Sequence, residues 1–168
     1  MHSLSSLMTH DPSLLTVISG GQTGVDRAAL DVAIELGIPS GGWCPKGRLA
    51  EDGRISDRYP LKETATDEFS VRTELNVLHS DGTLLLTLGE LSGGTLFTRY
   101  CAQHHRKPWF GSDLQTPVAP DRFHQWLVAE AIRTLNIAGP RESHRPGLIY
   151  ATAKDLLHIY LRSFRSGR

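Results

Sequence analysis

The amino-acid sequence predicts an α/β fold with three layers, in which helices cover both faces of a doubly wound parallel sheet. Three observations support this prediction. Patterns typical of strands and of helices alternate along the whole chain, as they do in parallel sheets with helical crossovers. Glycine-rich turns follow several of the apolar, strand-like runs. The length of 168 residues suits one domain, and the sequence has no internal repeat or linker.

The first predicted unit is a strand, a turn and a helix. Residues 14–19 are short, apolar and rich in β-branched side chains, which is typical of a buried strand. Apolar residues then recur at helical spacing over residues 25–36. Thr23 is a good N-cap for this helix, and Gly37 is a natural C-terminal stop.

The remaining elements continue the alternation. A charged segment, residues 45–60, is long for a connector in a compact domain, and such loops are often functional. We predict further strands at 38–44, 61–66, 83–89, 107–111 and 136–139, and further helices at 69–79, 95–105, 120–135 and 148–164.

Composition limits the classes of partner. We expect residues 1–13 to form a flexible N-terminal arm and residues 14–168 to form the single domain. Eighteen basic residues balance eighteen acidic ones, so bulk charge gives no reason to expect nucleic acid or an anionic membrane as a partner. The apolar runs are shorter than the roughly 20 residues that cross a bilayer. Cys44 and Cys101 lack zinc-site spacing and suit a reducing compartment, so we expect a cytoplasmic protein without zinc.

Three turns are expected to open on one edge of the sheet, because each follows a strand and precedes a helix. Their sequences are SGGQTGVD, GELSGGT and AGPRES. Backbone N–H groups at a helix N-terminus favour an anion, and glycine allows its close approach. One such turn can simply be a tight bend, but three of them, with Arg141 in the third, favour a phosphate or similar oxyanion. We then expect Gly21→Val to abolish ligand binding without unfolding the domain.

Two standard nucleotide motifs do not fit the chain. The Walker A pattern G-x-x-x-x-G-K-[ST] is absent. In the dinucleotide fingerprint G-x-G-x-x-G, the first glycine is replaced by Ser19, and the second strand ends in GGWC without the carboxylate that the fingerprint needs. We therefore expect no NAD.

Several blocks of the sequence closely resemble the family of proposed molybdenum-cofactor carriers. The blocks occur in that family's order over about residues 15–150 and read SGGQTGVDRAALDVA, GGWCPKGRLAEDGRI, RYPLKET, RTELNVLHSDGTLLL, GELSGGT and NIAGPRES. The family is related to the Rossmann-like LOG-type phosphoribohydrolases and DprA. The resemblance implies a Rossmann-like sheet, a pocket for a phosphorylated ligand, with molybdenum cofactor as the named candidate, and a homo-oligomer (dimer or tetramer). Molybdoenzymes are the implied protein partners.

The resemblance also assigns residues to the ligand site. The first turn and the helix after it supply Gly20, Gly21, Gln22, Thr23, Gly24 and Arg27. The second turn supplies Ser92, Gly93, Gly94 and Thr95. The charged loop supplies Lys46, the helix at 69–79 supplies Arg72, and the third turn supplies Arg141. Asp26 fits either ligand contact or a role in complementing the helix dipole.

The chain departs from the LOG-type pattern P-G-G-x-G-T-x-x-E at its last position. Aligned on Gly94 and Thr95, Thr98 stands where LOG-type enzymes have the glutamate that assists cleavage of the N-glycosidic bond. We therefore expect a carrier or sensor of a phosphorylated ligand, either molybdenum cofactor (molybdopterin) or a nucleotide. The alternative is a LOG-like hydrolase of nucleoside monophosphates, with Arg72 and Glu90 as its catalytic residues.

Overall fold

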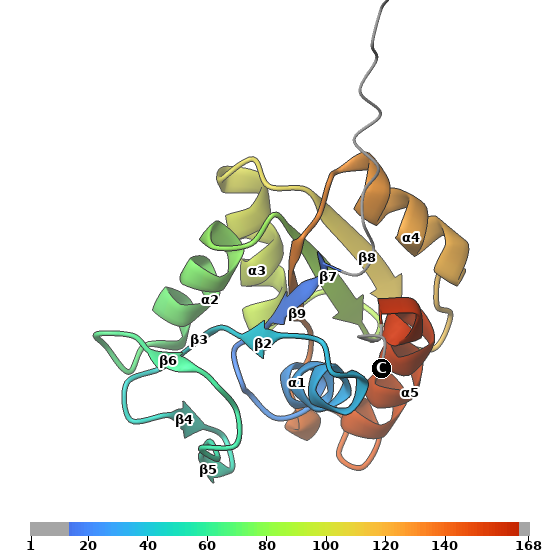
Figure 1. The fold of residues 1–168 in the computed structure, drawn as a ribbon. Helices are drawn as coiled ribbons and strands as arrows, with labels where there is room; N and C mark the ends of the chain where they lie inside the picture. The colour runs from blue at the N-terminus through green and yellow to red at the C-terminus, as the bar shows by residue number, and fades with distance from the viewer. Residues whose placement is uncertain (1–13, 165–168) are drawn as a thin grey trace, which may run out of the picture.

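A five-stranded parallel sheet forms the centre of the protein (Figure 1). The computed structural model describes residues 14–164, and the arm expected at residues 1–13 lies outside them. The strand order is β2-β1-β9-β7-β8, and every neighbouring pair is parallel. The strands are β1 (Thr16–Ile18), β2 (Ser40–Gly41), β7 (Gly82–Thr87), β8 (Trp109–Asp113) and β9 (Thr134–Ala138). The predicted α/β architecture with a parallel sheet is confirmed.

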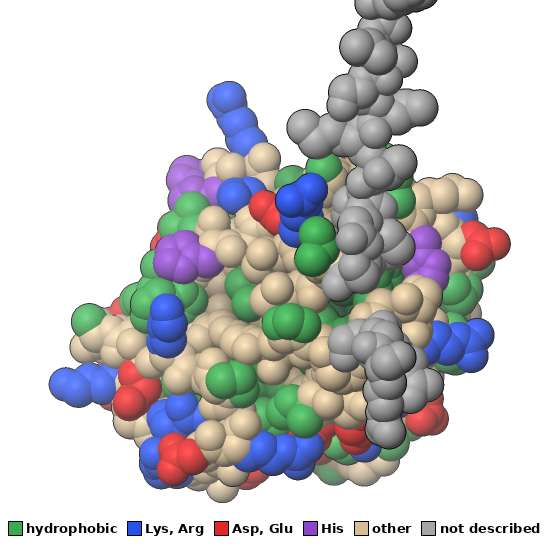
Figure 2. All heavy atoms as spheres, viewed as in Figure 1, with side chains coloured by type: hydrophobic (Ala, Val, Ile, Leu, Met, Phe, Trp, Pro, Cys, Tyr) green, Lys and Arg blue, Asp and Glu red, His purple; other side chains and the backbone are tan. Residues whose placement is uncertain are grey.

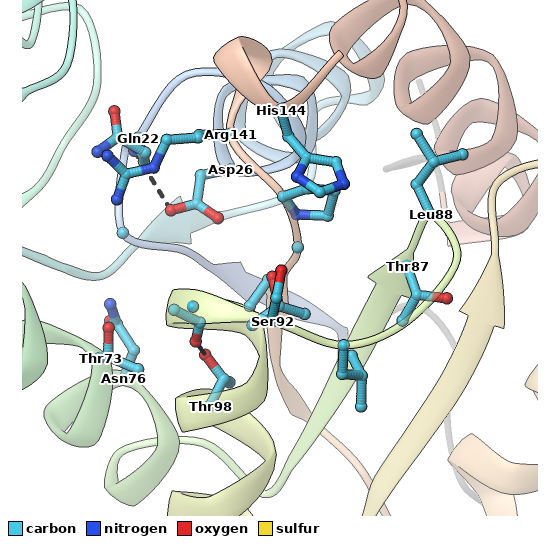
Figure 3. A pocket seen from close by; sticks show the side chains of 18 of the residues that line it. Gln22, Asp26, Thr73, Asn76, Thr87, Leu88, Ser92, Thr98, Arg141 and His144 are labelled. Carbon is cyan, nitrogen blue, oxygen red and sulfur yellow. Dashed lines mark hydrogen bonds between the residues drawn. The ribbon is translucent and has the colours of Figure 1, made fainter.

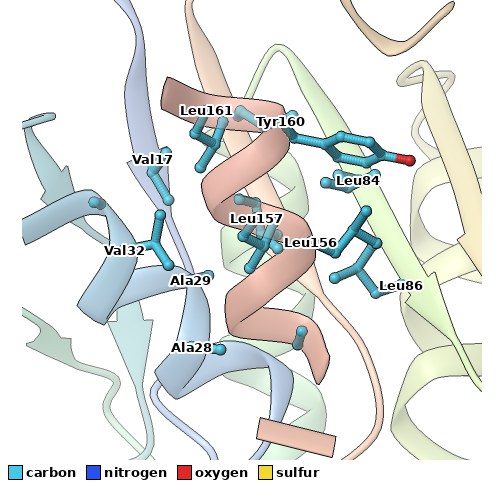
Figure 4. Packing of buried hydrophobic residues seen from close by; sticks show 14 of the residues in the cluster. Val17, Ala28, Ala29, Val32, Leu84, Leu86, Leu156, Leu157, Tyr160 and Leu161 are labelled. Atoms are coloured by element: carbon cyan, nitrogen blue, oxygen red, sulfur yellow. The ribbon is translucent and has the colours of Figure 1, made fainter. Parts of the chain in front are cut away.

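Helices cover both faces of this sheet (Figure 1). One face carries α1 (Val25–Leu36), α4 (Pro120–Ala129) and α5 (Ile149–Leu161), and the other carries α2 (Phe69–Leu78) and α3 (Gly93–His104). Leu84 and Leu86 join the large core cluster that contains side chains of α1, α4 and α5 (Figure 4). Leu85, between them, points to the opposite face, as strand geometry requires. The alternating leucines of β7 therefore hold the two helical layers on one sheet.

The predicted helix at 120–135 is wrong in its C-terminal part. The helix ends at Ala129, Ala131 adopts a φ of 50°, and β9 begins at Thr134. The Asp81 carboxylate accepts hydrogen bonds from the backbone N–H groups of Arg133 (2.9 Å) and Thr134 (2.8 Å). Tertiary pairing of β9 with β1 and β7 thus overrides the local helical pattern.

The segment between β2 and α2, which includes the charged residues 45–60, forms an ordered excursion below the sheet (Figure 1). It contains β3 (Trp43–Cys44), β4 (Leu49–Ala50), β5 (Gly53–Arg54) and β6 (Lys62–Glu63), which pair as β3-β6 and β4-β5. The buried guanidinium of Arg48 donates hydrogen bonds of 2.8–3.2 Å to four backbone carbonyls, those of Ile55, Ser56, Tyr59 and Leu61. Because one side chain satisfies so many carbonyls, the loop has a fixed path against α1.

The surface gives two further observations. On the face drawn in Figure 2, basic and acidic side chains are interspersed. Among the helices within residues 14–164, each is too short or too polar to cross a bilayer.

Candidate functional site

A pocket lies where the strand order reverses. The chain passes from β1 through α1 to β2 at one side of the sheet, and from β7 through α3 to β8 at the other, with β9 between them. Loops that leave the carboxyl ends of β1 and β7 therefore diverge onto opposite faces, and such a crevice is the usual ligand site of open α/β sheets. The pocket there has a volume of about 320 Å³ and is lined by the loops after β1, β7 and β9 (Figure 3). The three glycine-bearing turns thus meet at one place.

Most of the residues assigned to the site from the sequence line this pocket. They are Gly20, Gln22, Arg72, Ser92, Gly93, Gly94, Thr95 and Arg141, together with Glu90 of the alternative hypothesis. The wall also contains residues that the sequence did not single out, among them Asn76 of α2 and Asn136 of β9. Asn136 is 2% exposed. Its position could have been noticed in the sequence, because a polar amide within an apolar strand that precedes a glycine turn is unusual unless it faces a site.

Five assigned residues lie elsewhere. Thr23, Gly24 and Arg27 line a second groove, and Lys46 is exposed and lines neither concavity. Gly21 faces the charged loop, because a Cβ on it would lie 2.6 Å from Leu61 Cδ1. With a φ of 79° as well, valine at this position strains the fold instead of blocking the ligand, so the expected outcome of Gly21→Val is wrong.

Thr23 and Arg27 bind other parts of the chain. The Thr23 hydroxyl donates to Glu51 and accepts from the backbone N–H of Glu142 (3.1 Å), and the helix N-cap is Gly24 instead of Thr23. Arg27 forms a two-pronged ion pair with Asp52 (2.7 and 2.8 Å). The second groove, of about 680 Å³, is lined by the carboxylates of Asp31, Glu51, Asp52 and Glu142, which disfavour an anion there.

Asp26 occupies the turn between β1 and α1. Its Oδ2 accepts a hydrogen bond from the backbone N–H of Gln22 (3.2 Å) and lies 3.4 Å from Nη1 of Arg72. The same nitrogen of Arg72 donates to the carbonyl of Gly20 (2.9 Å). Burial raises the pKa of Asp26, although Arg72 opposes this effect, and burial lowers the pKa of Arg72. The turn expected to hold an external anion therefore holds a carboxylate of the protein itself.

The N-terminus of α3 remains open toward the pocket. Its N-cap, Ser92, makes no side-chain capping hydrogen bond, and the first backbone N–H with a helical partner is that of Leu96, which donates to Ser92 (3.2 Å). Apart from their own turn of the helix, residues 14–164 place no atom within 4 Å of the Cβ positions of Gly93 or Gly94. The preceding N–H groups of α3 have no partner among residues 14–164, so they can receive an anion.

A parallel sheet of this topology with a ligand-sized pocket at its reversal point defines the protein as a Rossmann-like α/β protein. The chain belongs to the circularly permutated YpsA SLOG family, whose sequence model matches residues 17–161. It is also similar to a crystal structure named "Putative molybdenum carrier protein", from Syntrophus aciditrophicus SB. The two share 48% sequence identity over 89% of this chain and 96% of that chain, with a TM-score of 0.83. No curated protein matches the sequence.

These comparisons confirm two predictions made from the sequence, the Rossmann-like fold and the family relationship. They leave the identity of the ligand and the roles of individual residues as predictions.

Proposed function

We propose that the protein is a carrier or sensor that binds a phosphorylated small ligand in the pocket where the strand order reverses, with a phosphate at the N-terminus of α3. The observation that supports this proposal is the uncapped start of α3, Ser92 to Thr95, on the wall of that pocket. Free N–H groups and the positive end of the helix dipole both favour a phosphate. A volume of about 320 Å³ is at the lower end of small-molecule sites, roughly 300–1,000 Å³.

The charges around the pocket are consistent with an anion. The guanidinium of Arg141 makes no hydrogen bond within residues 14–164, and its nearest carboxylate oxygen, Oε2 of Glu51, is 3.8 Å away. Arg141 can therefore turn to a phosphate, for which its planar donor set is well suited. Asp26 is the opposing charge on the wall, and Arg72, 3.4 Å away, partly offsets it.

Molybdenum cofactor is our first candidate, because the similar protein is named as a molybdenum carrier. The pocket residues fit its phosphate, whereas the chain offers little for direct binding of the metal. Cys44 and Cys101 are buried outside the pocket, where burial raises the pKa of each thiol. Within residues 14–164 we find no group of three His, Cys, Asp or Glu side chains that could hold a metal ion. The protein would thus bind the organic part of this cargo.

The proposal includes two properties of the assembled system. A carrier would pass its cargo to a molybdoenzyme, and we expect a homo-oligomer, either a dimer or a tetramer. Light scattering of the purified protein tests the second point, and transfer to an apo-molybdoenzyme tests the first.

The ligand itself is the main test. The protein is purified under native conditions, and the compound released on denaturation is analysed by mass spectrometry and elemental analysis. We expect a phosphorylated compound with the wild type and none with Gly94→Asp. The aspartate suits a helix N-terminus and has room, so the fold is retained while its charge repels a phosphate. Gly94→Ala is the uncharged control. A released compound without phosphate, or full retention by Gly94→Asp, contradicts the proposal.

A second candidate is the LOG-like hydrolase, which is favoured by the presence of Glu90 and Arg72 on the same pocket wall. Thr98, at the position of the family glutamate, donates its hydroxyl to the carbonyl of Gly94 (2.8 Å) and has no carboxylate to activate water. Incubation with nucleoside monophosphates and detection of free base separates the candidates. Turnover that is lost in Glu90→Gln would favour the enzyme over the carrier.

A further inference from the structure

We infer that the pocket contains a second anion subsite, formed by Gln22, Arg72 and Arg141, and that the ligand therefore carries two anionic groups. This inference rests on the proposed function, which places one phosphate at the start of α3. Figure 3 shows Gln22 and Arg141 on one side of the pocket and Ser92 and Thr98 on the other. Asp26 lies between these two sides. A carboxylate in that position disfavours one phosphate that spans both sides.

Gln22 has a buried donor without an acceptor. Its side-chain oxygen Oε1 accepts hydrogen bonds from the backbone N–H groups of Thr23 (3.0 Å) and Glu51 (2.9 Å). Two donors fix the oxygen on that side, so the amide cannot be exchanged end for end without loss of both bonds. The residue is only 5% exposed, and Nε2 is the buried side-chain atom of the described chain that lacks a partner. Since buried donors are normally paired, a ligand group in the pocket is the natural acceptor.

Two cations line the same pocket as this donor. The guanidinium carbons of Arg72 and Arg141 are 5.4 and 5.6 Å from the centre of the same ring, that of Phe69. Burial lowers the pKa of Arg72, and the charge of Arg141 lowers it further. The two like charges therefore repel each other, and an anion between them would relieve that repulsion.

The donors of these arginines are only partly used. Nη2 of Arg72 makes no hydrogen bond to a described residue, and neither does any nitrogen of Arg141. Glu51 contacts both Gln22 and Arg141, because its backbone N–H donates to Oε1 of Gln22 while its own Oε2 lies 3.8 Å from Nη1 of Arg141. The carboxylate of Glu51 already accepts hydrogen bonds from Thr23 and Ser143. One neutral and two cationic donors are thus left for a ligand, and this set selects an anion over a neutral carbonyl.

Gln22→Glu is the sharpest variant for a test. A glutamate has the same shape and keeps an oxygen for the N–H groups of Thr23 and Glu51, but it replaces the unpaired donor by an acidic oxygen. Arg141→Gln is a second variant of the same subsite, and it removes only a partly exposed side chain. Thermal unfolding of each variant verifies that the domain is folded.

The probe is labelled inorganic phosphate, measured by equilibrium dialysis with the full chain after removal of any bound compound. We expect two phosphates per wild-type chain, one for Gln22→Glu, one for Arg141→Gln and one for Gly94→Asp. The affected subsite should bind about 10- to 150-fold more weakly, the range for loss of a charge-assisted hydrogen bond.

The results separate this inference from the proposed function. Unchanged binding of two phosphates by Gln22→Glu and Arg141→Gln overturns the inference. A single phosphate in the wild type that is lost in both Gln22→Glu and Gly94→Asp also overturns it, but supports the proposed function. Two phosphates that persist in Gly94→Asp, with one lost in Gln22→Glu, overturn the proposed function and keep the second subsite. A natural ligand with one phosphate and no other anionic group also overturns the inference.

Discussion

Replacement of Gly24 by alanine should separate two of the three loops that build the pocket. Gly24 has φ 78° and ψ −125°, a conformation that side-chain-bearing residues rarely adopt. A Cβ on it would lie 2.5 Å from the carbonyl oxygen of Pro140 and 2.8 Å from the backbone nitrogen of Glu142. Both are backbone atoms, so they cannot turn away as a flexible side chain can. The N–H of Val25 also donates to Pro140 (3.2 Å), which holds the loops in contact.

The expected loss of stability follows from these two effects. Holding a residue other than glycine in such a sparsely populated region costs about 1–3 kcal/mol. Insertion of a methyl group into a closely packed contact costs about 1–3 kcal/mol more. The free energy of unfolding of Gly24→Ala should therefore fall by about 2–6 kcal/mol, and in a chain of this length Tm should fall by about 4–24 °C. Urea unfolding followed by circular dichroism measures the first quantity, and a thermal scan measures the second.

Gly94→Ala is the matched control. It makes the same chemical change in the first turn of α3, where no other part of the described chain lies within 4 Å of the Cβ position and φ is not positive. Its free energy of unfolding should be unchanged or should rise by up to about 1 kcal/mol. The reasoning is refuted if Gly24→Ala lies within about 0.5 kcal/mol of the wild type, or if both variants lose the same amount.

Three further predictions concern stability. Arg72→Met leaves Asp26 buried without its cation, so the free energy of unfolding in urea should fall by about 3–5 kcal/mol. Adding Asp26→Asn should restore part of this loss, and additive losses in the double variant would contradict the coupling. The hydrogen bond from Arg27 lowers the pKa of Asp52, so the pair stabilises the fold above the ordinary carboxyl pKa and loses this effect as the pH falls through the lower folded value. The stability difference between wild type and Arg27→Met should therefore shrink on acidification by the contribution of the ion pair, about 0–1 kcal/mol for such an exposed pair. The hydrogen bond from Arg27 Nε to the carbonyl of Gly21 (3.1 Å) does not depend on pH in this range, so its share should persist, and a difference that is constant from neutral to acid pH would be inconsistent with the prediction. Leu157→Ala, at a fully buried position of α5, should cost about 2–5 kcal/mol, and a loss below about 1 kcal/mol would show that the core collapses around it.

Much of the fold was predictable because its determinants are local. Apolar runs and helical periodicity place β1, α1 and β7 close to their observed bounds. The boundary between α4 and β9 was not predictable, because residues 130–135 have a helical pattern and join the sheet only through contacts with Asp81, β1 and β7. The position of β9 between β1 and β7 likewise depends on pairings distant in sequence.

The residues of the site that lie in turns after parallel strands were predictable, because such turns open on one edge of the sheet. That rule brings Gly20, Gly94 and Arg141 to one pocket without knowledge of the strand order. It does not give the direction in which neighbouring side chains point. Thr23 and Arg27 point to the opposite side of their turn, because the loop held by Arg48 reaches that side and supplies their partners.

The three turns differ in what they can give a ligand. In the first, the carboxylate of Asp26 lies where a bound anion would lie in a phosphate loop, and the turn's N–H of Gln22 donates to it. The third turn contributes the side chain of Arg141, while its carbonyl at Pro140 receives the N–H of Val25. The second turn presents its N–H groups at the start of a helix, α3, where they have no partner in the described chain. We therefore expect selectivity for an anion in this pocket to come mainly from one helix N-terminus and two arginines, acting against the carboxylate of Asp26, which Arg72 partly offsets.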